Sequence, residues 1–507
     1  MFWIGRFSHR LAALWLGLSS LAFYAAWDPA FVLILLTSIC FNYGAGYVIG
    51  HRISSENPKQ AEKILIFAIT LNITLLGYFK YTNFFISSTN AFFGGQLTGL
   101  DIVLPLGISF FTFTQIAYLV DVYRRISREY NFIHYLLFVT YFPHLIAGPI
   151  LHHKQMIPQF SLPETYSINL NNVTAGLSIF ILGLAKKVLI ADHLAEYATP
   201  IFKAADAGAT MMFIEAWVGS LSYTLQLYFD FSAYCDMAIG LSLMLNIRLP
   251  MNFNSPYKAT SIIDFWRRWH MTLSAFLRDY LYIPLGGNRK GKARRYINLI
   301  TTMLLGGLWH GAGWTFVIWG GLHGLYLMVN HSWRELKARL GWSEGGGSTK
   351  LGAGVLTFLS VVVAWVFFRA ESFSGAWAML AGMSGVNGVS LPASFATKAN
   401  LLDISGQVVV FQGMLSNTRL DIKNALIFIP LGLGMVWLLP NVREMFIHYQ
   451  ATWDDVFGKA PFSPPSNKCI RLLAWQPKPV VALLLGALFV ICIFSLTKAS
   501  EFLYFEF

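Results

Sequence analysis

The stretch Gly306-Gly307-Leu308-Trp309-His310-Gly311-Ala312-Gly313-Trp314 places a histidine inside an apolar run from Ile297 to Trp319, which is long enough to cross a bilayer. An ionisable side chain at that depth costs roughly 2.5–3.5 kcal/mol on insertion scales, so His310 is a functional candidate by default. The glycines leave free volume and allow a helix or a ligand to approach the backbone closely. A neutral imidazole there can act as a general base toward a hydroxyl. The same pattern also fits a histidine hydrogen-bonded between helices, with glycines that only permit packing.

The composition of the whole chain agrees with a membrane setting. Of its 507 residues, 55% are hydrophobic and only 12% are charged, whereas soluble proteins usually carry about 25% charged residues. The net charge of +12 comes from short basic clusters between apolar spans, as the positive-inside rule predicts. The chain contains no soluble basic module that would bind nucleic acid. The widely separated cysteines and the lack of an HExxH, Walker or GxSxG motif predict no metal site and no disulfide framework.

The apolar runs predict an all-α polytopic membrane protein. We expect about 10 to 13 membrane segments, several of them tilted or re-entrant because they are short or rich in glycine and proline. The candidate segments are Leu11–Trp27, Phe31–Ile49, Ile64–Phe79, Ile102–Val122, Phe132–Ile150, Val173–Ile190, Met211–Phe231, Ala233–Leu249, Ile297–Trp319, Gly320–Met328, Val355–Phe368, Ala425–Leu439 and Val480–Thr497.

Charge along the chain predicts its orientation and its organisation. Arg6 and Arg10 precede the first apolar run, so we expect the N-terminus in the cytoplasm. We expect one membrane-embedded domain over residues 1–507, with its motifs at about 100–330. An outer loop is predicted at about 385–423 and a cytoplasmic loop at about 441–479. There is no internal repeat and no soluble catalytic domain.

A second candidate group is Asp264-Phe265-Trp266-Arg267-Arg268-Trp269-His270. Interleaved aromatic and basic residues suit a helix at the membrane interface. They also suit a site for a phosphate-bearing ligand, because arginine pairs with phosphate through two parallel hydrogen bonds. Arg267 and Arg268 are therefore either phosphate ligands or members of a plain inside-positive loop.

Further polar residues lie in apolar surroundings. Asp230 and Asp236, in the same segment as Tyr228, need partners, for which Arg267, Arg268 or a histidine are candidates. They are either a structural ion-pair network or part of a site. His144, between Pro143 and Pro149, either lines a cavity or satisfies carbonyls that a broken helix frees. His323 is a candidate to contact and support His310 from behind the site.

These segments together resemble the membrane-bound O-acyltransferase superfamily, and most closely its bacterial branch that acetylates alginate, cellulose and peptidoglycan. The resemblance runs from about Tyr24 to the C-terminus. A lone Trp-His-Gly would be weak, but the ordered set is specific. Its most specific pieces are Pro143–Pro149, Tyr228–Asp236, Asp264–Tyr282, Leu304–Trp314 and the closing Phe502–Phe507.

The resemblance implies a ring of helices, thinned at its centre, around a tunnel or funnel. It implies that His310 is the family's catalytic histidine and that His270 is its second signature position. His310 would deprotonate a hydroxyl or carry the acyl group transiently, while His270 orients it or stabilises the oxyanion. The residues expected to bind substrate are Arg267, Arg268, Trp309, Tyr228, Asp230, Asp236, His144 and His323.

The resemblance also implies a setting for the reaction. Acetyl-CoA would be the donor and would dock from the cytoplasm, with no bound cofactor. The protein would lie in a bacterial inner membrane and act with a separate SGNH-like periplasmic acetyltransferase and the polysaccharide secretion machinery. Two alternatives remain at this point. One is a transporter or flippase, in which buried His and Asp residues form a proton or substrate path. The other is a non-catalytic scaffold for a periplasmic enzyme.

Overall fold

The computed structural model describes residues 1–126, 131–146, 148–342, 345–390, 409–410, 422–449, 451–453 and 473–496. These residues are mostly helical, and the strands among them are β1 (Val389–Ser390) and β2 (Val409–Val410), which pair in parallel. The predicted all-α membrane fold is confirmed. The predicted loops at 385–423 and 441–479 lie partly outside the described residues, as the closing Phe502–Phe507 does entirely. The division into one domain remains a prediction.

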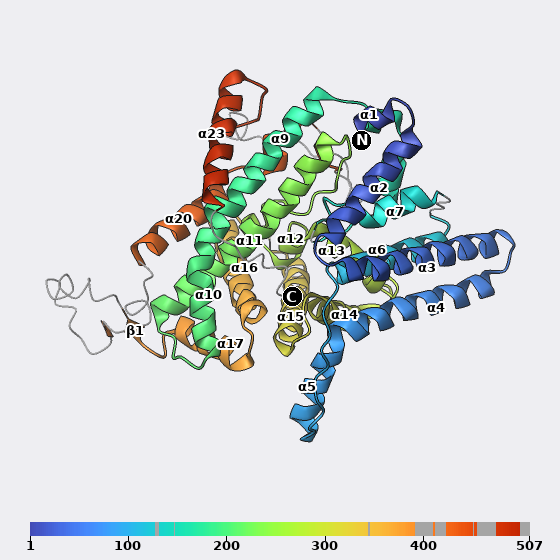
Figure 1. Cartoon of the computed structure of the whole chain (residues 1–507). Coiled ribbons are helices and arrows are strands. Elements are labelled where there is room, and N and C mark those ends of the chain that lie inside the picture. Colours follow the sequence, from blue (N-terminus) through green and yellow to red (C-terminus); the bar gives the residue numbers. More distant parts are fainter. Residues whose placement is uncertain are drawn as a thin grey trace.

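The N-terminal third forms antiparallel helices, and α3 and α4 run side by side in Figure 1. The helices begin at side-chain caps: Ser8 accepts a hydrogen bond at the start of α2, and Asp28 does so before Pro29 at the start of α3. The elements are α1 (Phe2–Gly5), α2 (His9–Ala25), α3 (Pro29–Ser54), α4 (Pro58–Leu76), the π-helix η1 (Gly77–Tyr81), α5 (Thr82–Phe93), α6 (Ile108–Tyr123), α7 (Phe132–Thr140), α8 (His153–Phe160) and η2 (Pro163–Tyr166).

The middle of the chain is built on the long helix α11 (Phe213–Met244), which packs along α9 (Leu170–Ala185). Two glycines allow this close approach, because a Cβ on Gly240 would lie 2.5 Å from the Gly176 carbonyl oxygen. The other elements here are the π-helix η3 (Lys186–Ala191), α10 (Asp192–Asp206), η4 (Pro256–Lys258), α12 (Ile262–Trp266), α13 (Met271–Phe276) and the π-helix η5 (Leu277–Tyr282).

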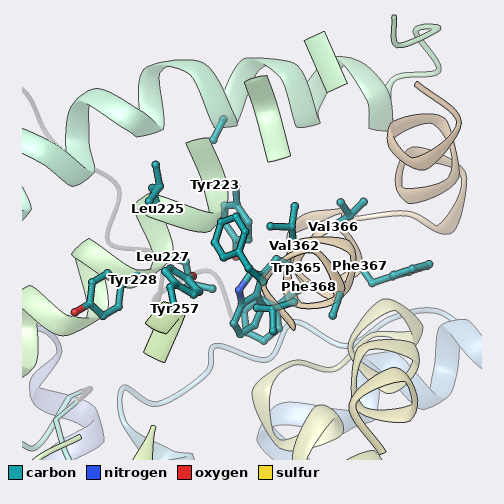
Figure 2. Packing of buried hydrophobic residues seen from close by; sticks show 14 of the residues in the cluster. Tyr223, Leu225, Leu227, Tyr228, Tyr257, Val362, Trp365, Val366, Phe367 and Phe368 are labelled. Atoms are coloured by element: carbon teal, nitrogen blue, oxygen red, sulfur yellow. The ribbon is translucent and has the colours of Figure 1, made fainter. Parts of the chain in front are cut away.

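The C-terminal elements complete the bundle. They are α14 (Gly291–His310), α15 (Trp314–Arg339), α16 (Gly347–Arg369), α17 (Phe373–Ser384), α20 (Ile422–Leu438), α21 (Val442–Met445), η7 (Ile447–Tyr449) and α23 (Pro479–Ser495). Figure 2 shows how α16 contributes to the core, where Trp365 lies near Tyr223 of α11. Phe368 contacts Trp319 of α15. Trp365 is 1% exposed, so burial of this face holds α16 against α11.

Four predicted boundaries are wrong. The end of Ile297–Trp319 and the whole of Gly320–Met328 lie in one helix, α15. The segments Met211–Phe231 and Ala233–Leu249 form one continuous helix up to Met244, because no glycine or proline interrupts the chain between them. The run Ile297–Trp319 divides after His310, where Gly311 takes an extended conformation. Helix α7 ends at Thr140 instead of continuing to Ile150, since Pro143 excludes helical backbone before it.

Within the described residues, four helical stretches are long and apolar enough to cross a membrane: Pro29–Ser54, Pro58–Phe93, Leu170–Asp206 and Gly347–Arg369. Ile108–Tyr123, Asn424–Leu438 and Pro479–Ser495 are apolar but shorter. Together with the exposed apolar side chains on these helices, such as Leu33 and Leu483, they describe a multi-pass membrane protein. The expected 10 to 13 segments include tilted and re-entrant ones, and that count remains a prediction.

Candidate active site

His310 lies at the joint between α14 and α15, as the last residue of α14. The next three residues are not helical, and α15 starts at Trp314. The two helices then pack closely, because a Cβ on Gly307 would collide with the Phe316 carbonyl oxygen. The glycines on either side of His310 in sequence therefore allow α14 and α15 to pack closely, and they also leave space around the imidazole ring.

The end of α14 is capped by η1, from the N-terminal part of the chain. The Lys80 ammonium donates hydrogen bonds to the carbonyl oxygens of Trp309 (2.7 Å) and His310 (3.0 Å). The Tyr81 hydroxyl donates to the Leu308 carbonyl oxygen (2.8 Å). These are carbonyls that the end of a helix leaves without partners, and a cation there also meets the negative end of the helix dipole.

The His310 imidazole lies among aromatic rings and close to a second histidine. The ring centroids of Trp309, Trp319 and Phe368 lie 5.0, 5.1 and 5.2 Å from it, and that of His270 lies 6.1 Å away. The residue is 7% exposed. Among the described residues, no side chain or backbone group hydrogen-bonds to its ring nitrogens. The ring is therefore held by packing, and its nitrogens are available to a bound molecule.

His270 is held by Asn252. Its Nδ1 lies 3.1 Å from the Asn252 Oδ1, which also accepts hydrogen bonds from the Thr272 amide and hydroxyl. The Thr272 amide identifies that amide atom as an oxygen, so His270 Nδ1 donates to it. His270 has a φ of 43°, and left-handed backbone at a non-glycine residue costs of order 1–3 kcal/mol and collects at functional sites. The pair His270 and His310, separated in sequence, is thus brought together by the fold.

Two cavities approach this pair from different directions. The His310 cavity has a volume of about 180 Å³ and is bordered by Trp27, Lys80, Leu104–Phe110, Ile146, Trp309 and His310. The Thr272 cavity has a volume of about 350 Å³ and is bordered by Ala117, Ile150–His152, Lys154, Gln155, Thr272, Ala275, Phe276, Arg278–Tyr280 and Trp453. The first borders the start of α6 and the second borders Ala117, about ten residues or roughly 15 Å further along that helix.

A third cavity, the Arg267 cavity, lies over α12, η5 and α14, and has a volume of about 500 Å³. It combines the cationic side chains of Arg267 and Arg278 with apolar residues such as Leu299 and Met303. Arg268 is turned to other partners: its Nε lies 3.0 Å from an Asp264 oxygen, and it donates to the Asn254 carbonyl oxygen. Of the two predicted phosphate ligands, the fold therefore brings only Arg267 to a cavity.

Asp230 and Asp236 are paired with lysines, not with the arginines or histidines considered from sequence. Both lie on α11, and their partners are the adjacent Lys187 and Lys186 of η3. Lys187 also reaches Asp192, and each of its two contacts measures 2.8 Å. These ion pairs join η3 to α11. They favour the interpretation of Asp230 and Asp236 as members of a structural ion-pair network.

The remaining candidates divide between the site and its surroundings. His144 Nε2 lies 3.3 Å from the Phe138 carbonyl oxygen, so it satisfies a carbonyl near the end of α7. Tyr228 packs against Tyr257 in the aromatic core. His323 accepts a hydrogen bond from Trp266, and its ring lies 4.9 Å from Trp319, which in turn contacts His310.

Sequence reasoning missed the roles of Lys80 and Asn252. The sequence does mark Lys80, because it is the single lysine or arginine between Lys63 and Arg124, within apolar surroundings. No sequence feature marks Asn252, since a single asparagine after a helix is common.

Comparison with known proteins identifies the family of the chain. Residues 60–368 match the family model described as MBOAT, the membrane-bound O-acyltransferase family. The chain is 46% identical over 404 residues to a peptidoglycan O-acetyltransferase of Helicobacter pylori, covering 75% of each protein. It is 44% identical over 379 residues to a probable alginate O-acetylase of Pseudomonas aeruginosa, covering 74% of this chain and 70% of that one. A teichoic acid D-alanyltransferase of Streptococcus thermophilus is 29% identical over 241 residues. The chain therefore belongs to the membrane-bound O-acyltransferase family and is an acyltransferase.

Proposed function

We propose that this chain takes acetyl groups from cytoplasmic acetyl-CoA and passes them across a bacterial inner membrane for O-acetylation of a glycan. The observation that supports this most is the position of the His270–His310 pair. One cavity borders His310 near the start of α6, and the other borders Thr272, whose hydroxyl shares Asn252 with His270. The pair therefore lies between two cavities, from which a thioester and an acceptor would approach it on different sides.

The reaction that fits these residues is acyl transfer with a histidine base. His310 takes the proton of an acceptor hydroxyl, the hydroxyl oxygen attacks the thioester carbonyl carbon, and the carbon–sulfur bond breaks. The CoA thiolate recovers the proton from the imidazolium. In the alternative route, a His310 nitrogen attacks the thioester first and an acetyl-imidazole forms before the hydroxyl reacts. Rapid quench of the wild-type protein with labelled acetyl-CoA distinguishes these routes by the presence of acetylated His310.

The hydrogen bond to Asn252 limits what His270 contributes. Because Nδ1 donates to Asn252, the neutral ring presents an unprotonated Nε2 toward its other side. Such a nitrogen accepts a proton or orients a donor. It does not donate to an oxyanion unless the ring is charged. We therefore assign His270 to orientation and proton transfer, in preference to oxyanion stabilisation.

The Arg267 cavity suits the headgroup of acetyl-CoA. Arg267 supplies a charge for a phosphate, and the apolar wall suits the pantetheine arm. Arg278 also borders this cavity, but its guanidinium is already paired with Asp279. Arg267→Glu should raise the KM for acetyl-CoA by about 10-fold or more with little change in kcat, because it acts on binding. Arg268→Glu is the matched control, since that side chain is already paired with Asp264. Equal effects of the two reversals would remove this assignment.

The acceptor is a cell-envelope or secreted glycan, such as peptidoglycan, alginate or cellulose. The relatives named for peptidoglycan and alginate acetylation support this class. A separate periplasmic acetyltransferase of the SGNH type and the secretion machinery would then complete the transfer.

The deciding measurement is the acetyl-ester content of peptidoglycan and secreted polysaccharide in strains that express the wild-type chain, His310→Ala or His270→Ala at equal membrane levels. Loss of a histidine base predicts a fall of about 10²–10⁴-fold for His310→Ala. The control is His51→Ala, which alters an exposed histidine at the end of α3. Unchanged ester content in His310→Ala would favour a scaffold. Acetyl-CoA-independent transport of a solute by that variant would favour a transporter.

A further inference from the structure

Three side chains with metal-binding atoms meet at the far end of α6 from the His310 cavity. They are Asp121, near the end of α6, and His152 and His153, at the start of α8. The Asp121 Oδ2 lies 2.8 Å from His152 Nε2 and 3.6 Å from His153 Nδ1. All three donor atoms lie within 4.8 Å of one another. The acyl-transfer mechanism uses none of these residues.

His153 is the unusual member of this group. It is 1% exposed, and neither of its ring nitrogens hydrogen-bonds to any described residue. Its distance of 3.6 Å to the carboxylate is too long for a hydrogen bond. A buried polar group left without a partner costs about 1–3 kcal/mol, so native structures rarely keep one. The partner of the His153 ring is therefore not a described protein group, and a water molecule or an ion beside Asp121 would supply it.

The donor set and its surroundings suit a transition-metal ion. Zinc binds imidazole nitrogen and carboxylate oxygen at about 2.0–2.2 Å, and two histidines with one carboxylate form one of its common three-ligand sets. The Tyr280 hydroxyl donates a hydrogen bond of 2.7 Å to Asp121 Oδ2 and also lies 2.7 Å from His152 Nε2. A hydroxyl at this position would orient both ligand atoms from outside the metal site. His152 and Tyr280 border the Thr272 cavity, which provides access for the ion.

We propose that Asp121, His152 and His153 bind one divalent transition-metal ion, with zinc as the best match. The ion would join α6 to the start of α8 and, through Tyr280, to η5 (Leu277–Tyr282). Because η5 directly follows α13 and leads toward α14, the site would hold together the segment between His270 and His310. The sequence predicted no metal site because the ligands come from separate segments and match no local motif.

The first test needs no substitution. The full-length protein is purified in detergent with a tag that contains no histidine, and its metal content is measured by plasma mass spectrometry. The proposal expects about one zinc per chain. After removal of the ion with a chelator, added Co²⁺ should give the visible absorption bands of a tetrahedral site, and added Zn²⁺ should abolish them. A wild-type chain that holds less than about 0.1 zinc and gives no cobalt bands would overturn the proposal. In that case the group would be a hydrogen-bonded cluster only.

Substitutions then assign the ligands. His153→Ala and Asp121→Asn should each lose the bound zinc, and Tyr280→Phe should keep one site but bind zinc about 10–100-fold more weakly. His51→Ala, which changes an exposed histidine elsewhere, should retain the metal. Retention of a full equivalent of zinc by a monodisperse His153→Ala protein would exclude this site. If that variant does not fold, the affinity of Tyr280→Phe decides, and an unchanged affinity would contradict the assignment.

Discussion

The Lys80 ammonium lies 3.0 Å from the carbonyl oxygen of His310, although 230 residues separate the two in sequence. This contact joins an N-terminal π-helix to the end of the helix that presents the candidate catalytic imidazole. The position of that imidazole therefore depends on residues that belong to none of the motifs around it.

The first prediction concerns that contact. Lys80→Met removes the donor for two carbonyl oxygens, and each buried acceptor without a partner costs about 1–3 kcal/mol. We expect kcat to fall by about 10-fold or more with little change in the KM for acetyl-CoA, because His310 shifts while the Arg267 cavity is intact. Lys80→Arg is the control and should recover part of the activity. A rise in KM alone would show that Lys80 acts on donor binding instead.

The second prediction concerns Asn252. Asn252→Ala removes the acceptor that orients His270, so transfer should fall by about 10-fold or more. Thr272→Ser keeps the hydroxyl that donates to the same oxygen and should stay near wild type. Acetyl-CoA turnover by purified protein in detergent measures both. Normal activity of Asn252→Ala would mean that packing against neighbouring rings such as Phe231 and Trp309 is enough to position His270.

The third prediction compares two adjacent glycines of α15. A Cβ on Gly320 would collide with the Met303 carbonyl oxygen, whereas one on Gly321 would make an ordinary contact of 3.5 Å with Leu304. Gly320→Ala should therefore destabilise the hairpin and lower activity, because backbone has to move. Gly321→Ala should be neutral or slightly stabilising, since alanine favours a helix over glycine by about 1 kcal/mol. Thermal unfolding in detergent compares the two variants, and equal Tm values would contradict this packing.

The fourth prediction tests the structural assignment of the buried acids. Lys187→Met leaves Asp230 and Asp192 without that cation, and loss of one partner of a buried pair costs about 3–5 kcal/mol. Adding Asp230→Asn should restore part of the stability, because the uncompensated charge is gone. Lys203→Met, at an exposed lysine of α10, is the control. If Asp230 contacts substrate, the double variant will be stable but inactive, which would return this residue to the site.

The sequence predicted the fold class, and the structure agrees because hydropathy alone requires helices in a bilayer. The apolar surroundings of His310 made it a candidate, and the family resemblance added His270 as its companion; the roles of both residues remain predictions. The sequence did not predict where α14 ends, because the groups that cap this end, Lys80 and Tyr81, approach from far away in the chain. The partners of Asp230 and Asp236 were missed for a related reason. Both lysines lie inside the predicted segment Val173–Ile190, and the sequence does not show that η3 faces α11.

The end of α14 at His310 has a consequence for engineering. Since η1 supplies the cap, a chimera that takes residues 291–339 from this protein will inherit the imidazole but not its anchor. Exchanges between relatives should therefore transfer residues 77–81 together with that hairpin. Two fragments divided in the loop between these regions would each lack half of the joint, and only their reassociation would restore it.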